Sequence, residues 1–175
     1  MLTYVYSRMG KTQETREGIE KLAPDDFGAL PRDGSWLLAI TGQASVVRFL
    51  GDAERAATLY RLLAPYDGRN VVIGSSGVST GWIGRSLGLL AAAMSKFDEA
   101  ARHFEAAIER NARMKARPFL ADSQCEYAAM LLERDAPGDR AKAAALLEAA
   151  MATARELGMR KLGQDAVGLA AGLRS

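Results

Sequence analysis

The chain has 175 residues, of which 49% are hydrophobic and 25% charged, and its formal net charge is +2. This length suits one domain with a continuous core, and the hydrophobic content excludes a disordered chain. The small net charge does not supply the broad positive field on which nucleic-acid binding depends, so we expect no nucleic-acid partner.

The cysteine and histidine content limits the chemistry available to the chain. Cys125 is the single cysteine, which excludes an internal disulfide and fits a reducing compartment. Together with the single histidine, His103, it does not complete a tetrahedral zinc site, so we expect no metal and no cofactor. No apolar run approaches the roughly 20 residues of a membrane span, and the first residues lack the order of a signal peptide. We therefore expect a cytoplasmic protein that contacts no membrane.

The apolar positions follow the 3.6-residue period of α-helices through most of the chain. In chain order, the predicted helices span residues 2–9, 12–22, 35–49, 53–64, 79–94, 97–114, 118–133, 140–157 and 160–173. Ala23-Pro24-Asp25-Asp26 and Pro65-Tyr66-Asp67-Gly68 interrupt them, because proline does not continue a helix and the other residues favour turns. Gly158 stands where a helix C-cap glycine belongs.

Taken in pairs, these helices form four hairpins, at about residues 1–23, 35–65, 79–114 and 118–157, followed by a capping helix at 160–173. Three columns of residues recur every 41 to 44 positions along the hairpins. They comprise a turn column (Gly10, Gly51, Ser95, Gly138), a small-residue column (Thr15, Ala56, Ala100, Ala143) and a large-residue column (Ile19, Tyr60, Phe104, Leu147). A period of this length is typical of a solenoid, in which each hairpin buries its apolar face against its neighbours. The sequence thus predicts an all-α fold and a single domain over residues 1–175.

These columns resemble the tetratricopeptide repeat, although their period is longer than the family's 34 residues. The third hairpin carries the best match, with Leu87-Gly88 and Ala91 on its first helix, then Phe97-Asp98-Glu99-Ala100, Phe104 and Ala107 on its second. The resemblance implies a right-handed solenoid of about four such hairpins plus the capping helix.

Residues 62–162 also resemble the carboxy-terminal helical-repeat region of large bacterial signalling proteins. In those proteins the repeats follow an ATPase domain, with a nucleotide-cyclase or DNA-binding domain elsewhere in the chain. The markers are Pro65-Tyr66-Asp67-Gly68-Arg69-Asn70-Val71-Val72, Asn111-Ala112-Arg113-Met114 and Ala154-Arg155-Glu156-Leu157-Gly158-Met159. The likeness implies a non-enzymatic regulatory or scaffolding module that lacks the catalytic domains.

Two short motifs suggest enzymes but lack the context that enzymes need. Gly77-Val78-Ser79-Thr80-Gly81 matches the nucleophile elbow, yet no further strands are predicted and His103 lies inside a repeat helix. We interpret it as a turn in which Ser79 or Thr80 caps the following helix. Gly10-Lys11-Thr12 ends like a phosphate loop, but valine occupies position 5, where that loop requires glycine. We therefore expect no enzymatic activity.

In stacked hairpins of this kind, the first helix of each pair lines the concave face. Repeat offsets place Arg48, Trp82, Arg85 and Asp122 there, as a groove for a protein or peptide partner. Trp82 either contacts that partner, since Trp and Arg contribute much of the energy at interfaces, or packs against residues 71–73. Self-association is compatible with this hypothesis, because the short first hairpin leaves an apolar end. The alternative is a small-ligand sensor with an apolar pocket between hairpins, near Trp82 and Arg85.

Overall fold

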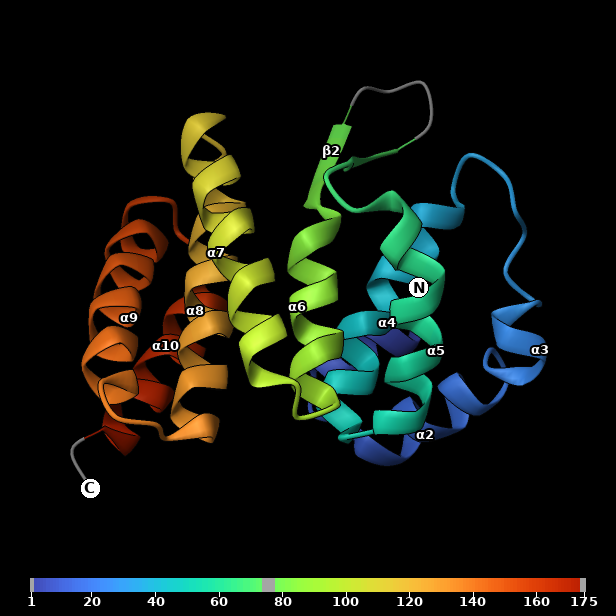
Figure 1. The fold of residues 1–175 in the computed structure, drawn as a ribbon, viewed down its shortest axis with the longest axis horizontal. Helices are drawn as coiled ribbons and strands as arrows, with labels where there is room; N and C mark the ends of the chain where they lie inside the picture. The colour runs from blue at the N-terminus through green and yellow to red at the C-terminus, as the bar shows by residue number, and fades with distance from the viewer. Residues whose placement is uncertain (1, 74–77, 174–175) are drawn as a thin grey trace. The chain divides into compact units, whose positions relative to one another are not determined.

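The computed structural model describes residues 2–73 and 78–173, and most of them form α-helices (Figure 1). In chain order the elements are α1 (Leu2–Arg8), α2 (Thr12–Glu20), α3 (Pro24–Phe27), α4 (Trp36–Leu50), α5 (Ala53–Leu63), the 3₁₀ turn η1 (Ala64–Tyr66), β1 (Asn70–Ile73), β2 (Val78–Trp82), α6 (Ile83–Ala93), α7 (Phe97–Arg113), α8 (Arg117–Arg134), α9 (Asp139–Glu156) and α10 (Arg160–Gly172). The predicted predominance of helix is confirmed. Within the described ranges, none of the helices combines the length and apolar character of a membrane span.

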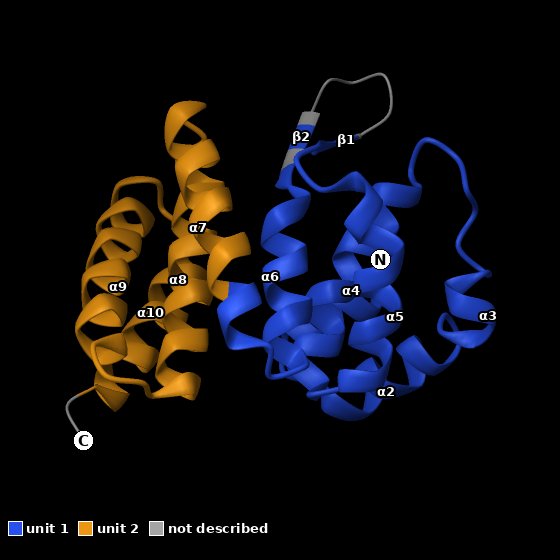
Figure 2. Cartoon of the chain, in the orientation of Figure 1, with its two compact units in different colours: residues 1–100 blue, residues 101–175 orange. Residues whose placement is uncertain are grey.

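The chain divides into two compact units, residues 1–100 and 101–175, which Figure 2 shows in different colours. The boundary falls inside α7, so unit 1 holds its first turn and unit 2 the rest. The single domain over residues 1–175 stays a prediction.

The four residues of the turn column all have a positive φ, although they stand at different places relative to the helix ends. Gly10, Gly51, Ser95 and Gly138 lie between the two helices of their pairs, with φ angles of 72°, 65°, 57° and 88°. This left-handed region suits glycine, which has no Cβ to clash with the backbone, and serine adopts it at a cost. Gly51 is the C-cap of α4, whereas Gly138 is the N-cap of α9 and Asp135 is the left-handed C-cap of α8. The feature that the column shares is therefore the positive φ.

The other two columns coincide with the most buried positions of the helices. All four members of the small-residue column are fully buried, at 0% exposure. Ile19, Phe104 and Leu147 of the large-residue column are equally buried, whereas Tyr60 is half-buried and donates from its hydroxyl to Glu99 Oε1 at 2.6 Å. Small residues let two helices approach closely, and large ones fill the space between neighbouring turns.

Unit 1 is organised around α4, which packs against α1, α2, α5 and α6. The outermost helix, α1, directs its small polar residues inward: Thr3 and Ser7 are buried, while Leu2 and Met9 are 68% and 63% exposed. Gly18 of α2 explains the close approach, because a Cβ there would lie 2.6 Å from Thr3 Oγ1. As a result, α1 presents an apolar stripe of Leu2, Val5 and Met9 to solvent.

Unit 2 consists of the rest of α7 with α8, α9 and α10, and α10 packs against both α8 and α9. Asn111 of α7 is buried and donates from Nδ2 to the Phe119 carbonyl oxygen and to Ser123 Oγ of α8, both at 3.3 Å. These bonds fix the end of α7 to the start of α8.

The structure corrects the prediction for the start of the third hairpin. A helix was expected from residue 79, but α6 begins at Ile83, and β2 pairs antiparallel with β1 before it. The expected capping by Ser79 or Thr80 is wrong, because Trp82 occupies the N-cap position without a side-chain bond and the Ser79 hydroxyl donates to Asn70 Oδ1 at 2.7 Å. Gly77 of the elbow motif lies outside the described residues. The valine-rich run at 71–73 thus forms a short hairpin with the strand after it.

The acidic turn after α2 also differs in detail from the prediction. Residues Pro24–Phe27 form the short helix α3, and Asp25 and Asp26 within it have left-handed φ angles of 53° and 55°. The segment still separates two helices, as the sequence predicts.

Candidate partner-binding surface

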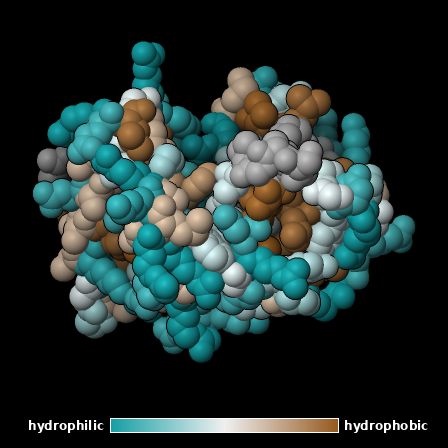
Figure 3. Space-filling view, turned by 90° about the horizontal axis from the view of Figure 1, so that it is seen from above, coloured by the Kyte–Doolittle hydropathy of each residue, from teal (hydrophilic) through white to brown (hydrophobic). Residues whose placement is uncertain are grey.

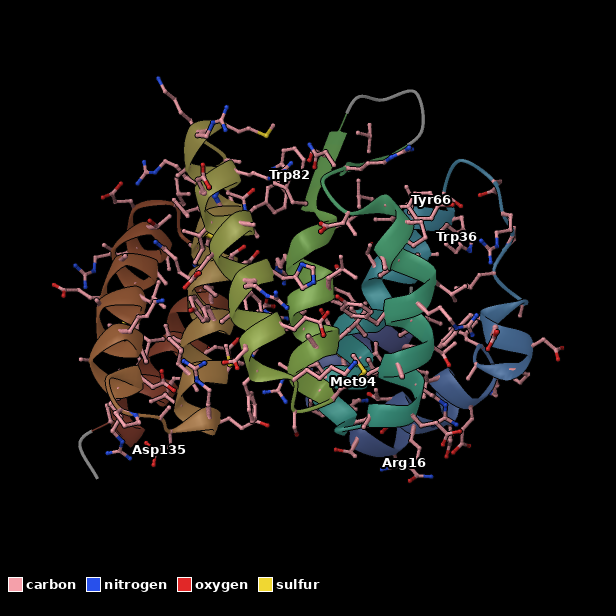
Figure 4. All side chains as sticks on the ribbon, in the orientation of Figure 1. Arg16, Trp36, Tyr66, Trp82, Met94 and Asp135 are labelled. Carbon is pink, nitrogen blue, oxygen red and sulfur yellow. The ribbon has the colours of Figure 1, made fainter. Side chains whose placement is uncertain are left out.

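The first turns of α4 and α6 lie at the same end of unit 1, because a short chain of contacts connects them. The ring of Trp36, the first residue of α4, lies 5.6 Å from the ring of Tyr66 in η1, centroid to centroid. Three residues later, the Arg69 carbonyl oxygen accepts a hydrogen bond of 3.1 Å from the Ile83 N–H, where α6 begins. In the hairpin, Asn70 pairs with Trp82. Figure 4 shows Trp36, Tyr66 and Trp82 at this end, which we call the aromatic end, and Met94 and Arg16 at the other.

Two arginines stack on these aromatic rings. The Arg32 guanidinium carbon lies 4.2 Å from the ring centroid of Trp36, and that of Arg69 lies 5.6 Å from the centroid of Tyr66. We call Arg32, Trp36, Tyr66 and Arg69 the arginine–aromatic row. Trp36 is buried, at 5% exposure, whereas both arginines are exposed. A cation over an aromatic face is attracted by the ring quadrupole, so the row places two positive charges beside aromatic rings on the surface.

The aspartates next to these arginines in the sequence, Asp33 and Asp67, accept hydrogen bonds from residues one or two positions away. Asp33 Oδ1 accepts from the Ser35 hydroxyl at 2.7 Å and from the Ser35 N–H at 2.8 Å. The hydroxyl bond, followed by the N–H bond, holds the pKa of Asp33 below its ordinary value. Asp67 Oδ1 accepts from the Gly68 N–H at 2.8 Å. The first turns of α4 and α6 contain no acidic residue, so the positive charge at this end is only partly balanced.

Apolar surface is also found at this end of unit 1. Val72 of β1 is 43% exposed, and Figure 3, which looks onto this end of the molecule, shows apolar surface bordered by hydrophilic residues. Such a mixture is typical of a surface that contacts another protein.

The structure brings together only part of the predicted groove. Trp82 and Arg85 lie on β2 and in the first turn of α6, at the aromatic end, and both are half-buried. Arg48 is also half-buried but lies twelve residues after Trp36, about 18 Å along α4 at 1.5 Å per residue. Asp122, half-buried on α8, belongs to unit 2. The partner groove itself therefore stays a prediction.

Sequence reasoning did not select the arginine–aromatic row. Tyr66 and Arg69 stood out only as markers of resemblance, and Trp36 was only one residue of the helix predicted over 35–49. The spacing of Arg32 and Trp36 gave a weak local signal, because four residues separate a cation from an aromatic ring near a helix start. The contact between Trp36 and Tyr66 joins residues thirty positions apart, so only the tertiary structure reveals it.

Unit 2 contains a second polar cluster, Glu105, Tyr127 and Lys142, which we call the polar clamp. The Tyr127 hydroxyl donates to Glu105 Oε1 at 2.8 Å, and Lys142 Nζ donates to Glu105 Oε1 at 2.6 Å and to the Tyr127 oxygen at 2.9 Å. Burial chiefly raises the pKa of Tyr127, and the Lys142 bond chiefly lowers that of Glu105. A raised pKa keeps the phenol protonated, so the clamp does not create a phenolate base. It holds α7, α8 and α9 together.

Within the part of the chain that the structure describes, no three His, Cys, Asp or Glu side chains come together to hold a metal ion.

Comparisons with protein-family models, with curated proteins and with solved structures give no match. The likeness to tetratricopeptide repeats and to bacterial signalling regulators is therefore a proposal about this chain.

Proposed function

We propose that this chain is a tetratricopeptide-like helical-repeat module that binds a protein or peptide partner and has no enzymatic activity of its own. The observation that carries the proposal is the aromatic end of unit 1, where exposed arginines, aromatic rings and apolar surface all occur. Arginine and aromatic residues are enriched among those that contribute most to binding at protein interfaces.

The packing of the helices supports the repeat half of the proposal. In unit 1, α4 packs on both helices of the preceding pair, α1 and α2, and α6 packs on both α4 and α5. In unit 2, α10 packs on both α8 and α9. Each new helix thus covers the pair before it, which is the nearest-neighbour pattern of a repeat array. The resemblance to bacterial signalling proteins extends the proposal to a regulatory or scaffolding role in such a regulator.

Chemical crosslinking in native lysate, followed by mass spectrometry, tests the proposal. The wild-type chain is compared with Arg69→Gln combined with Arg85→Gln, and with Arg16→Gln as a control. Arg16 is an exposed arginine at the opposite end of unit 1 (Figure 4). We expect a reproducible partner that the double variant loses and the control retains. A partner retained by all three variants would refute the aromatic end as the binding surface, and recovery of the bait alone would refute partner binding.

A further inference from the structure

The guanidinium groups of Arg32 and Arg69 contact aromatic rings and still have N–H donors available for a ligand. Each guanidinium lies over an aromatic ring, Arg32 closely and Arg69 more distantly, yet neither takes part in a side-chain hydrogen bond or an ion pair with another residue in the described ranges. A guanidinium has five N–H donors, and stacking on a ring face leaves those donors at its edge available. The neighbouring carboxylates of Asp33 and Asp67 accept bonds from Ser35 and from the Gly68 N–H, respectively.

This arrangement lowers the cost of binding an anion. A mobile arginine loses rotamer entropy when it binds a carboxylate, and the ring contacts restrict the two guanidiniums before binding, Arg32 more than Arg69. Arg32 is held most closely, 4.2 Å from the centroid of a tryptophan that is almost fully buried. Charge-assisted, bidentate bonds between guanidinium and carboxylate are among the strongest hydrogen bonds in proteins.

We propose that the arginine–aromatic row recognises an acidic peptide segment of the partner, with Arg32 and Arg69 each donating to a separate carboxylate. This inference rests on the proposed function, because it names the chemistry of the partner at the same surface. The two arginines sit on different rings, which suits two separate monoanions better than one phosphate dianion. A nucleic acid is disfavoured, because its binding depends on many phosphate contacts and the chain carries a net charge of only +2.

Side-chain NMR of the intact chain tests the inference directly. The probes are short acetylated peptides with two glutamates separated by increasing numbers of alanines, and the same peptides with glutamine in place of glutamate. We expect saturable shifts of the Arg32 and Arg69 Nε–Hε signals with at least one glutamate peptide, at a dissociation constant below about 1 mM. We expect no shifts with the glutamine peptides. The absence of saturable shifts with every glutamate peptide would overturn the inference.

Variants separate recognition by geometry from attraction by charge. Arg32→Gln and Arg69→Gln are each expected to weaken the best glutamate peptide about tenfold, and Arg16→Gln to leave it unchanged. Arg32→Lys keeps the charge but not the planar fork, so we expect a several-fold loss. Equal binding of the glutamate peptide by Arg32→Lys and the wild type would show attraction by charge alone and would contradict the inference. An RNA hairpin that binds the same arginines more tightly than any peptide would also contradict it. Far-UV circular dichroism confirms that each variant is folded.

The two proposals fail separately. If the crosslinked partner persists on Arg32→Gln combined with Arg69→Gln but is lost on Arg85→Gln, the proposed function stands and the acidic-peptide inference falls. If no partner is captured but the glutamate peptides bind, the row recognises carboxylates and the proposed protein partner lacks support.

Discussion

Replacing Tyr127 by phenylalanine or by alanine measures separately what its hydroxyl and its ring contribute to unit 2. Tyr127 is 1% exposed, and its ring stacks on Phe104 with centroids 5.6 Å apart. Tyr127→Phe removes only the bonds to Glu105 and Lys142. The side chains of these two partners are 53% and 48% exposed, so water replaces much of what they lose. We expect a cost of about 1 kcal/mol for Tyr127→Phe and about 3–5 kcal/mol for Tyr127→Ala, which leaves a cavity beside Phe104.

The pH dependence of the phenylalanine variant follows from the polar clamp. The Lys142 bond, and next the Tyr127 bond, lower the pKa of Glu105 from 4.5, so the stabilisation from its charge is present above that value. It is lost as the pH falls through the lowered pKa. The Glu105 bond chiefly raises the pKa of Lys142 from 10.5, so the contribution of Lys142 is present below 10.5 and is lost as the pH rises through the raised value. We expect the cost of Tyr127→Phe to be constant near neutral pH and smaller in strong acid.

Urea unfolding at neutral pH, followed by two signals, provides the assay. Far-UV circular dichroism reports helix in both units, whereas tryptophan fluorescence reports unit 1, since both tryptophans, Trp36 and Trp82, lie there. The free energies of unfolding of wild type, Tyr127→Phe and Tyr127→Ala are obtained from the circular dichroism transitions. Equal losses for the two variants would refute the reasoning, because they would show that the hydroxyl, rather than ring packing, dominates.

Four further predictions address stability and association. Ser95→Gly should stabilise the chain by up to about 1 kcal/mol in urea unfolding, because Ser95 has a φ of 57°, and Ser95→Val should destabilise it. Gly18→Ala should cost about 1–3 kcal/mol by crowding Thr3. Gly42→Ala is the control and should be neutral or stabilising, because a Cβ there meets nothing within 4 Å. Equal effects of the two substitutions on the free energy of unfolding would contradict the packing of α1 on α2. Asp139→Asn should cost about 1.5–3 kcal/mol, because it removes the negative charge and leaves a single acceptor oxygen for the Arg134 guanidinium. The wild-type contribution should vanish in acid titration as the pH falls through the lowered pKa of Asp139. Val5→Glu combined with Met9→Glu should change the free energy of unfolding by less than about 0.5 kcal/mol, because both side chains are exposed. If the wild-type chain self-associates through this apolar stripe, sedimentation equilibrium should show that association for the wild type and not for the double variant.

Local sequence patterns were sufficient to predict the helices and the turns between them. Gly51 and Gly138 mark positions that require a left-handed backbone, and Ala56 and Ala143 mark sites where helices approach closely. Both requirements act within one or two helical turns, so they leave a periodic signal in the chain. The β1–β2 hairpin was missed because valine-rich residues next to glycines suit a strand, a turn or a buried helix end equally well until a partner strand is known.

The candidate site depended on contacts that no local pattern specifies. Sequence alone determined most of the helical ranges, the positions buried in the repeat columns and that Trp82 and Arg85 stand near a helix start, but not the strand at 78–82 or the short helix α3. Only the tertiary structure brought Trp36 of α4 against Tyr66 of η1 and thereby placed Arg32 and Arg69 on neighbouring rings. The physical reason is that helix formation and burial depend on neighbours three or four residues away, whereas a stacked row of side chains depends on how separate helices pack.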